Sequence, residues 1–190
     1  MRIGQYPFVN GVGPRISRGE YGYTLLELLL IIVIMGVLAT SAIPVINQSV
    51  QARQGASRDE VVRLFEFARG RAMASGVPAG VLVDTNENTL TLVTLSQGGD
   101  VVDIVDPIDG GVKFSNLDNE YAGVAINSFV NGDGSSGDGA VWFDFRSEPH
   151  TRDGISGDFD SVFIQNATVT LSTGTLIVIH SYSGLVEERQ

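Results

Sequence analysis

The sequence predicts an α+β chain in which a long N-terminal helix packs against an antiparallel β-rich head. The first observation is the uncharged stretch from Leu28 to Ala52, which opens with eight consecutive large apolar side chains. The second is the apolar pattern that follows, whose spacings of three and four residues indicate an amphipathic helix. The third is a change to period two after Pro78, in short runs bounded by turn residues, which is typical of strands. A helix packed on a β layer is the arrangement that buries both apolar surfaces.

Residues 1–22 are predicted to be a leader peptide. They are polar and weakly basic and contain no apolar run of their own. Arg15 and Arg18 favour a cytoplasmic N-terminus by the positive-inside rule, but Arg53 and Arg58 beyond the apolar stretch weaken that argument. The orientation of the chain in a membrane therefore cannot be taken from its charges alone.

Residues 23–44 are predicted to form a transmembrane or filament-core helix. Tyr23 to Ile43 would extend roughly 31 Å at about 1.5 Å per residue, enough to cross a hydrocarbon layer of about 30 Å. One carboxylate, Glu27, lies inside this span. An acid at such a position costs roughly 2.5–3.5 kcal/mol on insertion scales, so Glu27 calls for a partner or a function.

The stretch from Gly22 to Pro44 resembles the processing signal of type IV pilins and type II secretion pseudopilins. The matching features are a glycine, an aromatic residue, Thr-Leu-Leu-Glu and a long aliphatic run. The resemblance implies that a prepilin peptidase cuts after Gly22 and methylates Tyr23, and that Glu27 is the hallmark acid. Pro44 also falls where the family's helix carries a proline. Tyr23 stands where phenylalanine is commoner, and Glu20 beside the cut site also departs from the family's pattern.

Glu27 is the residue expected to act in subunit assembly. We expect its carboxylate to pair with the α-ammonium group of Tyr23, most usefully from a neighbouring subunit, because a paired acid is penalised much less in lipid. The alternative is that the side chain extends to the membrane surface. Gly36 and Pro44 are interpreted as points of flexibility in the helix, although both residue types are common in membrane helices.

Residues 45–78 are predicted to continue the helix as an amphipathic segment. Its apolar residues recur on one face, and its charged residues fall largely outside that face. Gly76, Val77 and Pro78 are expected to end the helix. The predicted stripe consists of Val61, Leu64, Phe65, Ala68, Ala72 and Met73.

Residues 79–190 are predicted to form a single periplasmic head rich in short antiparallel strands, beginning with a hairpin. The head resembles the H-type minor pseudopilin and its pilus relative of the FimT type. That resemblance is carried by Arg69–Ala72 with Gly76–Pro78, by Val141–Phe143 and by the closing strand pair. The strand candidates are 81–83, 89–95, 101–105, 112–114, 124–130, 140–145, 161–165, 167–171 and 175–180.

The composition excludes several classes of site. The chain has no cysteine and a formal net charge of −10. Disulfides and thiolate metal ligands are therefore impossible. The head carries four basic and seventeen acidic residues, a balance of −13, so no nucleic-acid partner is expected. The sequence also contains neither a nucleophile-elbow motif nor a phosphate-binding glycine-rich loop, so no enzymatic activity and no cofactor are predicted.

The weak candidate for a metal site is the loop from Asn131 to Gly139, where Asp133 and Asp138 resemble calcium ligands. The loop lacks the bidentate glutamate of an EF-hand, because the twelfth position is Trp142. A flexible loop at the tip of a hairpin explains its composition equally well. The two histidines are expected to be a solvent-facing His150 in a polar loop and a His180 at the end of a strand.

The resemblance implies a pseudopilin of a type II protein secretion system, built into a periplasmic pseudopilus as a minor component at the tip or at initiation. The protein would be a single-pass protein of the bacterial inner membrane, with its head in the periplasm. Its partners would be the prepilin peptidase and other pseudopilins or pilins of the filament. One alternative is a minor pilin of a type IV pilus, serving initiation, adhesion or DNA uptake. Another class is a membrane-tethered periplasmic enzyme or receptor.

Overall fold

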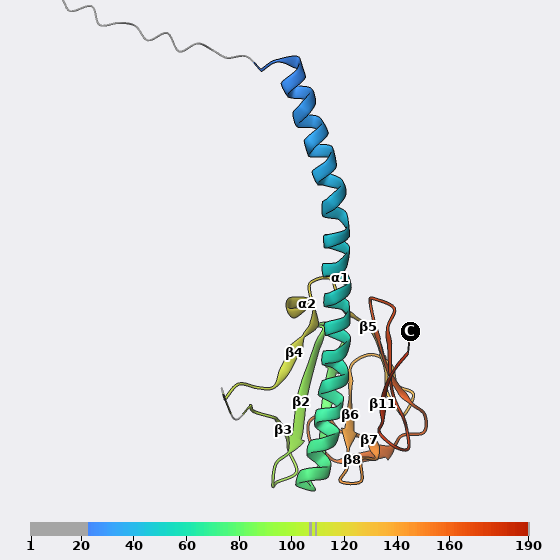
Figure 1. The fold of residues 1–190 in the computed structure, drawn as a ribbon. Helices are drawn as coiled ribbons and strands as arrows, with labels where there is room; N and C mark the ends of the chain where they lie inside the picture. Colours follow the sequence, from blue (N-terminus) through green and yellow to red (C-terminus); the bar gives the residue numbers. More distant parts are fainter. Residues whose placement is uncertain (1–22, 107, 109, 190) are drawn as a thin grey trace, which may run out of the picture. The chain divides into compact units, whose positions relative to one another are not determined.

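The computed structural model describes residues 23–106, 108 and 110–189, and within residues 40–47 it describes the backbone alone. Contacts divide the chain into two compact units, 1–45 and 46–190, which are described separately. Helix α1 (Leu25–Ser75) supplies the described part of the first unit and opens the second (Figure 1). The predicted single helix is confirmed.

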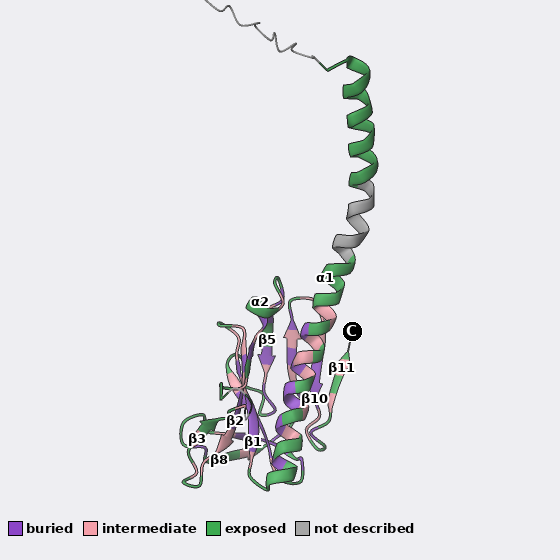
Figure 2. Ribbon diagram, turned by 60° about the vertical axis from the view of Figure 1, so that its left-hand side comes forward, coloured by how far each residue is buried: buried purple, intermediate pink, exposed green. Residues whose placement is uncertain are grey.

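In the second unit, α1 buries one face against the strands. Val61, Leu64 and Phe65 are fully buried, as are Ala68 and Ala72 on the next turns, which confirms most of the predicted stripe (Figure 2). Met73 is 54% exposed and was wrongly assigned to the stripe. It follows Ala72 directly, and one residue turns a helix by about 100°, so its side chain points away from the buried face.

The end of α1 lies where the sequence predicted it. The amide of Gly76 donates to the carbonyl of Ala72 at 3.0 Å, and Gly76 has a φ of +71°. A left-handed residue just after the last turn is a common helix cap, and glycine adopts that conformation without steric penalty. The chain then enters the first strand through Pro78.

The larger sheet has seven strands, all antiparallel to their neighbours, in the order β3-β2-β1-β6-β7-β8, with β4 also paired to β2. The predicted hairpin at its start is confirmed, since Val81 pairs with Leu92. The strands are β1 (Ala79–Asp84), β2 (Thr89–Leu95), β3 (Val101–Asp103), β4 (Phe114–Asn116), β6 (Gly139–Phe143), β7 (Pro149–Arg152) and β8 (Phe159–Val162).

The smaller sheet has four strands in the order β11-β10-β9-β5. Its strand β11 is tied to α1, because Arg58 pairs with Glu188 at 3.0 Å and the Val186 amide donates to Glu66 at 3.4 Å. The strands are β5 (Ile126–Val130), β9 (Ala167–Leu171), β10 (Leu176–Ile179) and β11 (Val186–Arg189). A one-turn helix, α2 (Leu117–Glu120), precedes β5 and is capped by Asn116.

The main core joins the buried face of α1 to both sheets. Val141 and Phe143 contribute from the larger sheet, and Phe129, Val169 and Ile177 contribute from the smaller one. A second, smaller cluster contains Val93, Ala140 and Trp142. Ala140 and Trp142 alternate along β6 with the residues of the main core, so this cluster lies on the opposite face of the larger sheet.

Three features of the head differ from the prediction. β5 and β6 belong to different sheets, so the loop between them connects two sheets, and Val130 and Ser136 form only an isolated antiparallel bridge across it. β7, β11 and α2 were not predicted. The strand expected at 112–114 lies at Phe114–Asn116, while Val112 forms an isolated bridge with Val105.

Candidate functional site

The beginning of α1 holds the residues that the sequence singled out for assembly. Tyr23 is 74% exposed. Thr24 caps the helix, because its hydroxyl oxygen accepts a hydrogen bond from the amide of Glu27 at 3.2 Å and its carbonyl accepts from the amide of Leu28 at 3.1 Å. A threonine followed three residues later by a glutamate has the spacing of a capping box. This signal was present in the sequence, but Thr24 was not identified from it.

Capping gives Glu27 a local role that does not use its carboxylate. Only its backbone amide bonds to Thr24, and the carboxylate has no partner among the residues that the structure describes. An acidic side chain in the first turn of a helix is favourable beside the positive end of the helix dipole. The carboxylate of Glu27 is therefore exposed and available to a group from outside the chain.

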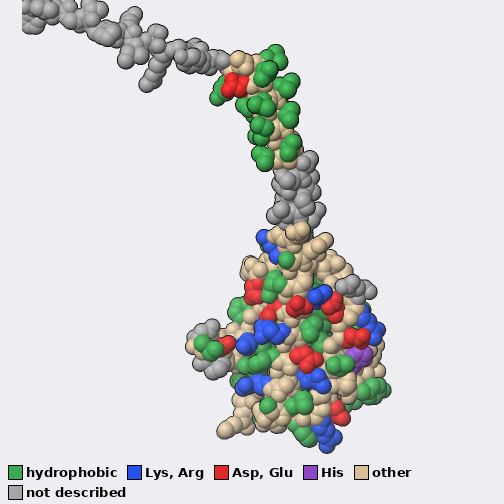
Figure 3. Space-filling view, viewed as in Figure 1, with side chains coloured by type: hydrophobic (Ala, Val, Ile, Leu, Met, Phe, Trp, Pro, Cys, Tyr) green, Lys and Arg blue, Asp and Glu red, His purple; other side chains and the backbone are tan. Residues whose placement is uncertain are grey.

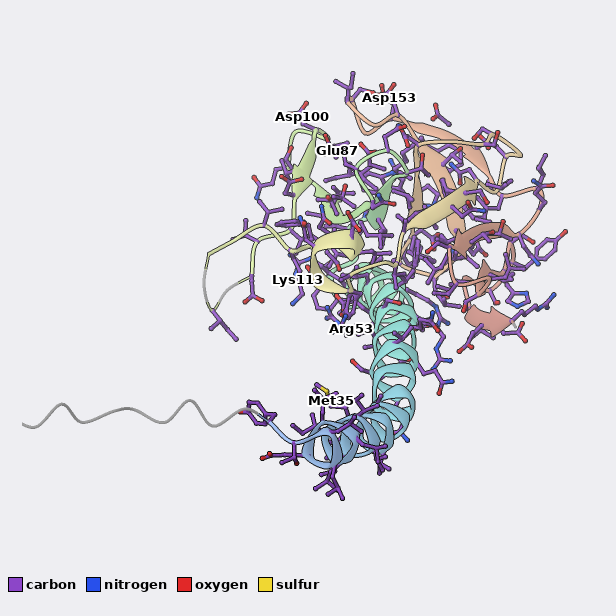
Figure 4. The ribbon with its side chains drawn as sticks, turned by 90° about the horizontal axis from the view of Figure 1, so that it is seen from above. Met35, Arg53, Glu87, Asp100, Lys113 and Asp153 are labelled. Atoms are coloured by element: carbon purple, nitrogen blue, oxygen red, sulfur yellow. The ribbon has the colours of Figure 1, made fainter. Side chains whose placement is uncertain are left out.

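The first part of α1 exposes large apolar side chains at nearly every position; the space-filling view shows one side of it (Figure 3), and Met35 is one of these residues (Figure 4). Fully burying one exposed side chain of this kind is worth about 1.5–3 kcal/mol, so burying these twelve partly exposed side chains would be worth roughly 11–22 kcal/mol. A continuous apolar surface of this extent marks an interaction site. The residues, each 44–84% exposed, are Leu25, Leu26, Leu28, Leu29, Leu30, Ile31, Ile32, Val33, Ile34, Met35, Val37 and Leu38.

Among the helices in the described residues, none meets the combined length and hydropathy required for a membrane crossing. The proposed cleavage residue Gly22 and the side chain of Pro44 both lie outside the described residues. Gly36 lies within α1, and a Cβ added there would have no neighbouring atom within 4 Å. The flexibility assigned to Gly36 and Pro44 stays a prediction.

Asp133 and Asp138 bond to different parts of the head. Asp133 accepts from the amide and hydroxyl of Ser135, whereas Asp138 accepts from the amide and hydroxyl of Thr85 at 2.8 and 2.7 Å and from Asn86 at 2.9 Å. These hydrogen bonds lower the pKa of both carboxyl groups. In the described part of the chain, no group of three or more acidic or histidine side chains could hold a metal ion.

The loop that contains these two acids is anchored to the head. The side-chain amide of the buried Asn131 donates to the carbonyl of Ala140 at 3.1 Å, and its oxygen accepts from the amide of Gly132 at 2.8 Å. The ring of Phe163 covers Gly132 so closely that a Cβ there would overlap it. Val130 and Ser136 form an isolated antiparallel bridge across the segment, so it makes a hairpin-like turn, and the flexibility assigned to it stays a prediction.

His150 was expected to face solvent in a loop, but it lies in β7 and is only 3% exposed. Its Nδ1 lies 3.3 Å from the carbonyl of Glu148, and its Nε2 accepts from Nε of Arg152 at 2.7 Å. Burial lowers the pKa of His150, so the ring is neutral near pH 7. The signal for burial was weak, because the sequence around His150 is polar.

His180 lies directly after β10, where the sequence placed it at a strand end. Its Nε2 is 2.9 Å from the carboxylate of Glu187, and this contact, together with Arg189, lowers the pKa of Glu187. Neither histidine is hydrogen-bonded to a serine or threonine hydroxyl within the described ranges. Among the described residues, neither histidine therefore forms the hydrogen bond to a hydroxyl that a nucleophile-and-base pair of this type would have.

Acidic residues outnumber basic ones in the head, with seventeen Asp and Glu residues and four Lys and Arg residues. Asp100 and Asp153 lie on its outer loops and their side chains extend outward (Figure 4). A cavity of about 550 Å³ is lined by several further acids, with Arg152 as its one basic residue. Its acidic lining residues are Asp84, Asp133, Asp138 and Asp160.

One comparison with known proteins, a match to a family model, falls on this site. Residues 17–43 match the family described as the prokaryotic N-terminal methylation motif. Two solved structures of the minor pseudopilin EpsH from the type 2 secretion system of Vibrio cholerae are similar to the chain. One has 13% identity and a TM-score of 0.49, and covers 71% of this chain and 94% of its own. The other has 17% identity and a TM-score of 0.41, and covers 66% and 92%.

No curated protein matches the chain in sequence. The methylation motif ends one residue before Pro44 and includes Gly22, Tyr23 and Glu27. The structure has the long helix, which begins inside the motif, and the antiparallel β head that the sequence predicted. The chain therefore carries a prokaryotic N-terminal methylation motif at the start of a long helix, which is followed by an antiparallel β-rich head.

Proposed function

We propose that the chain is a pseudopilin subunit of a type II protein secretion system. It is cut by a prepilin peptidase between Gly22 and Tyr23, methylated at the new N-terminus, and assembled into a periplasmic pseudopilus as a minor component at the tip or at initiation. The observation that carries this proposal is the methylation motif over residues 17–43, on a helix whose apolar side chains are exposed all round.

Burial of those apolar side chains provides the driving force for both locations of the subunit. Before assembly the first part of α1 lies in the bacterial inner membrane as a single-pass anchor, with the head in the periplasm. During assembly the same surface packs against the helices of other pseudopilins. The exchange of lipid for protein contacts is nearly neutral in hydrophobic free energy, so packing and polar contacts decide which neighbour is accepted.

Glu27 supplies the polar contact. Its carboxylate is free of partners within the described chain, and Tyr23, four residues earlier, becomes the N-terminal residue after cleavage. Methylation leaves the terminal amine positively charged. A neighbouring subunit that places its terminal ammonium group on this carboxylate removes the penalty of an unpaired acid in an apolar layer. The pair therefore sets the register of one subunit against the next.

A structural role also fits the head better than catalysis or nucleic-acid binding. The head bears a balance of −13, which repels a phosphate backbone. Its histidines are hydrogen-bonded to a backbone carbonyl, an arginine and a carboxylate, and neither touches a hydroxyl nucleophile among the described residues. We propose that the protein is not an enzyme and that its partners are the peptidase, the membrane and other filament subunits.

Processing can be tested by co-expressing the full chain with an active prepilin peptidase and analysing its N-terminus by mass spectrometry. The expected product begins with N-methylated Tyr23 and lacks residues 1–22. A Gly22→Val variant should keep Met1, because a branched side chain obstructs the close approach of the peptidase at the scissile bond. A control prepilin must be cut in the same cells. If it is cut while the wild-type chain keeps Met1, the proposal fails.

A further inference from the structure

The larger sheet buries side chains on both of its faces. We call the face that points away from the main core the outer face. Trp142 and Val93 are fully buried on it. Trp142 pairs in register with His150 of β7, and residues paired across neighbouring strands lie on the same face of a sheet. His150 therefore lies beside Trp142 on the outer face.

The turn between β7 and β8, residues 153–158, covers part of the outer face, and we call it the strap. A Cβ added to Gly157 would overlap the carbonyl oxygen of Gly99 and the side chain of Leu95, so the strap approaches the turn after β2 as closely as a glycine allows. Leu95 packs against the buried cluster that contains Trp142. The strap is therefore one of the segments that shield this cluster from water.

Arg152 ties the strap to His150. Its Nη1 donates to the carbonyl of Gly157 at 2.8 Å, and its Nε donates to Nε2 of His150 at 2.7 Å. A guanidinium has donors only, so Nε2 must be the acceptor, and the ring proton belongs on Nδ1, which lies 3.3 Å from the carbonyl of Glu148. The ring of Phe159 lies against both groups, 5.5 Å from the His150 ring and 5.8 Å from Cζ of Arg152, measured to its centroid. The closed arrangement therefore requires a neutral His150.

Protonation of His150 would remove this acceptor. Nε2 would then carry a hydrogen that faces the N–H of Arg152, and two positive charges would lie at the distance of a hydrogen bond. Burial lowers the pKa of His150 and Arg152 lowers it further, while the carbonyl of Glu148 and the carboxylate of Asp144 raise it. The closed arrangement thus opposes protonation through both burial and charge.

The carboxylates near the pair do not replace the lost acceptor. Burial lowers the pKa of Arg152 most, while Asp144, Asp158 and Asp160 raise it. Within the described residues, none of these carboxylates is hydrogen-bonded to His150 or Arg152, and the same is true of the Glu148 carboxylate. The end of α1 adds no charge, because the residues through which it borders the same cavity are Gly76 and Pro78.

We propose that the strap is a pH-sensitive cover of the outer face, which is released when His150 takes up a proton at mildly acidic pH. The guanidinium of Arg152 then leaves the ring and the carbonyl of Gly157, and the strap moves away from Leu95. The indole Nε1 of Trp142 is buried without a hydrogen-bond partner among the described residues, so water reaching it favours the released form. The released form is a minor species, and it exposes apolar surface that is closed near pH 7. This inference concerns the head alone and does not depend on processing at Gly22.

Release should become more frequent as the pH falls, because the released form binds a proton that the closed form excludes. The ring in the released form titrates near the ordinary pKa of histidine, about 6.5. Between pH 7.5 and pH 5.5, the equilibrium constant for release should therefore rise by up to about tenfold.

The test uses single-cysteine variants of the full chain in detergent, since the chain has no cysteine of its own. Val93→Cys places a thiol on the outer face, and Val81→Cys places one in the main core on the other face of the same sheet. The rate of reaction with a dipyridyl disulfide is measured at both pH values. It is divided by the rate for the same variant in concentrated urea at the same pH, which cancels the ionisation of the thiol.

The normalised rate for Val93→Cys should rise by up to about tenfold towards the lower pH. It should change little in dilute urea, because local release exposes little surface. Val81→Cys should react more slowly at both pH values and depend steeply on urea, as expected for a thiol that only global unfolding exposes. Ala140→Cys is a second position on the outer face and gives the same readout if Val93→Cys does not fold.

Further changes in the Val93→Cys chain identify the residue responsible. His150→Gln should abolish the pH response, because an amide oxygen can accept from Arg152 but does not titrate. His180→Gln changes the only other histidine, which contacts Glu187, and should keep the response. Arg152→Gln removes the link to the strap and should raise the rate at both pH values. The near-ultraviolet circular dichroism of the single tryptophan, Trp142, verifies that each variant is folded.

Three results would overturn the proposal. The first is an equal normalised rate for Val93→Cys at the two pH values, and the second is an undiminished pH response in the chain that also carries His150→Gln. The third is a rate for Val93→Cys that equals that of Val81→Cys and depends on urea as steeply, since this would assign the exposure to unfolding of the whole head.

Discussion

Replacing Gly132 by alanine should destabilise the head, because the loop between the two sheets is packed against an aromatic ring. A Cβ at Gly132 would overlap the ring of Phe163, which is itself only 4% exposed. Gly132 also donates its amide to the buried Asn131 and accepts at its carbonyl from the amides of Ile164 and Gln165. The backbone of Gly132 is thus fixed on both sides, so the ring must move instead.

The expected cost is about 1–3 kcal/mol, the usual range for an overpacked core. For a chain of this size that corresponds to a decrease in Tm of roughly 2–12 °C. Guanidinium unfolding of the full chain in detergent can be followed by the fluorescence of Trp142, the only tryptophan and a fully buried one. The control is Gly154→Ala, since a Cβ at Gly154 meets no atom within 4 Å.

Gly154→Ala should change the stability by no more than about 0.5 kcal/mol. Phe163→Ala should remove the clash, so that Gly132→Ala adds little in the double variant and the two changes are strongly non-additive. If Gly132→Ala is as stable as the wild type, Phe163 does not hold this loop, and the segment is the flexible one that its composition indicated.

Further predictions concern the core, a turn and a buried histidine. Leu64→Ala should lower the free energy of unfolding by about 2–5 kcal/mol, whereas Met73→Ala, at an exposed position, should stay within about 0.5 kcal/mol in the same urea titration. Asp138→Ala removes the acceptor for the amide and hydroxyl of Thr85 and should accelerate hydrogen exchange in the turn after β1. Because burial lowers the pKa of His150, the unfolded chain takes up this proton just below pH 6.5 and the closed head does not. As the pH decreases below 6.5, the free energy of unfolding should therefore fall by up to about 1.4 kcal/mol per pH unit. His150→Gln should make the free energy of unfolding less dependent on pH in this range.

Elements with a strong apolar period could be predicted from the sequence. The helix ends at Ser75, just before the predicted Gly76, and the strand predicted at 167–171 has these bounds in the structure. In both cases the apolar residues recur at the period of the element because they face the core, and residues that end a helix or strand lie at the predicted bounds. The processing and assembly roles of Gly22, Tyr23 and Glu27 stay predictions, and they rest on a short motif with fixed spacing and not on an apolar period.

Elements without that period could not be predicted. Strand β7, Pro149–Arg152, alternates weakly, and its histidine is buried through contacts with residues that are close only in the folded head. Strand β11, Val186–Arg189, is mostly charged and is held by pairing with β10 and by Arg58 of α1. The division of β5 and β6 between two sheets has the same origin, because periodicity gives the face of a strand but not its partner.

The role of Glu27 in assembly is the claim on which the account depends most, and comparing Glu27→Gln with Thr24→Ala tests it directly. Thr24→Ala removes the helix cap, worth about 1 kcal/mol, but keeps the carboxylate. The measurement is the amount of each methylated variant in sheared filaments, relative to the amount in membranes, when the other subunits of the secretion system are present. We predict that Glu27→Gln lowers incorporation by roughly tenfold or more, because the terminal ammonium group of the neighbour loses its anion, while Thr24→Ala stays close to the wild type. Equal incorporation of Glu27→Gln and the wild type would contradict the account.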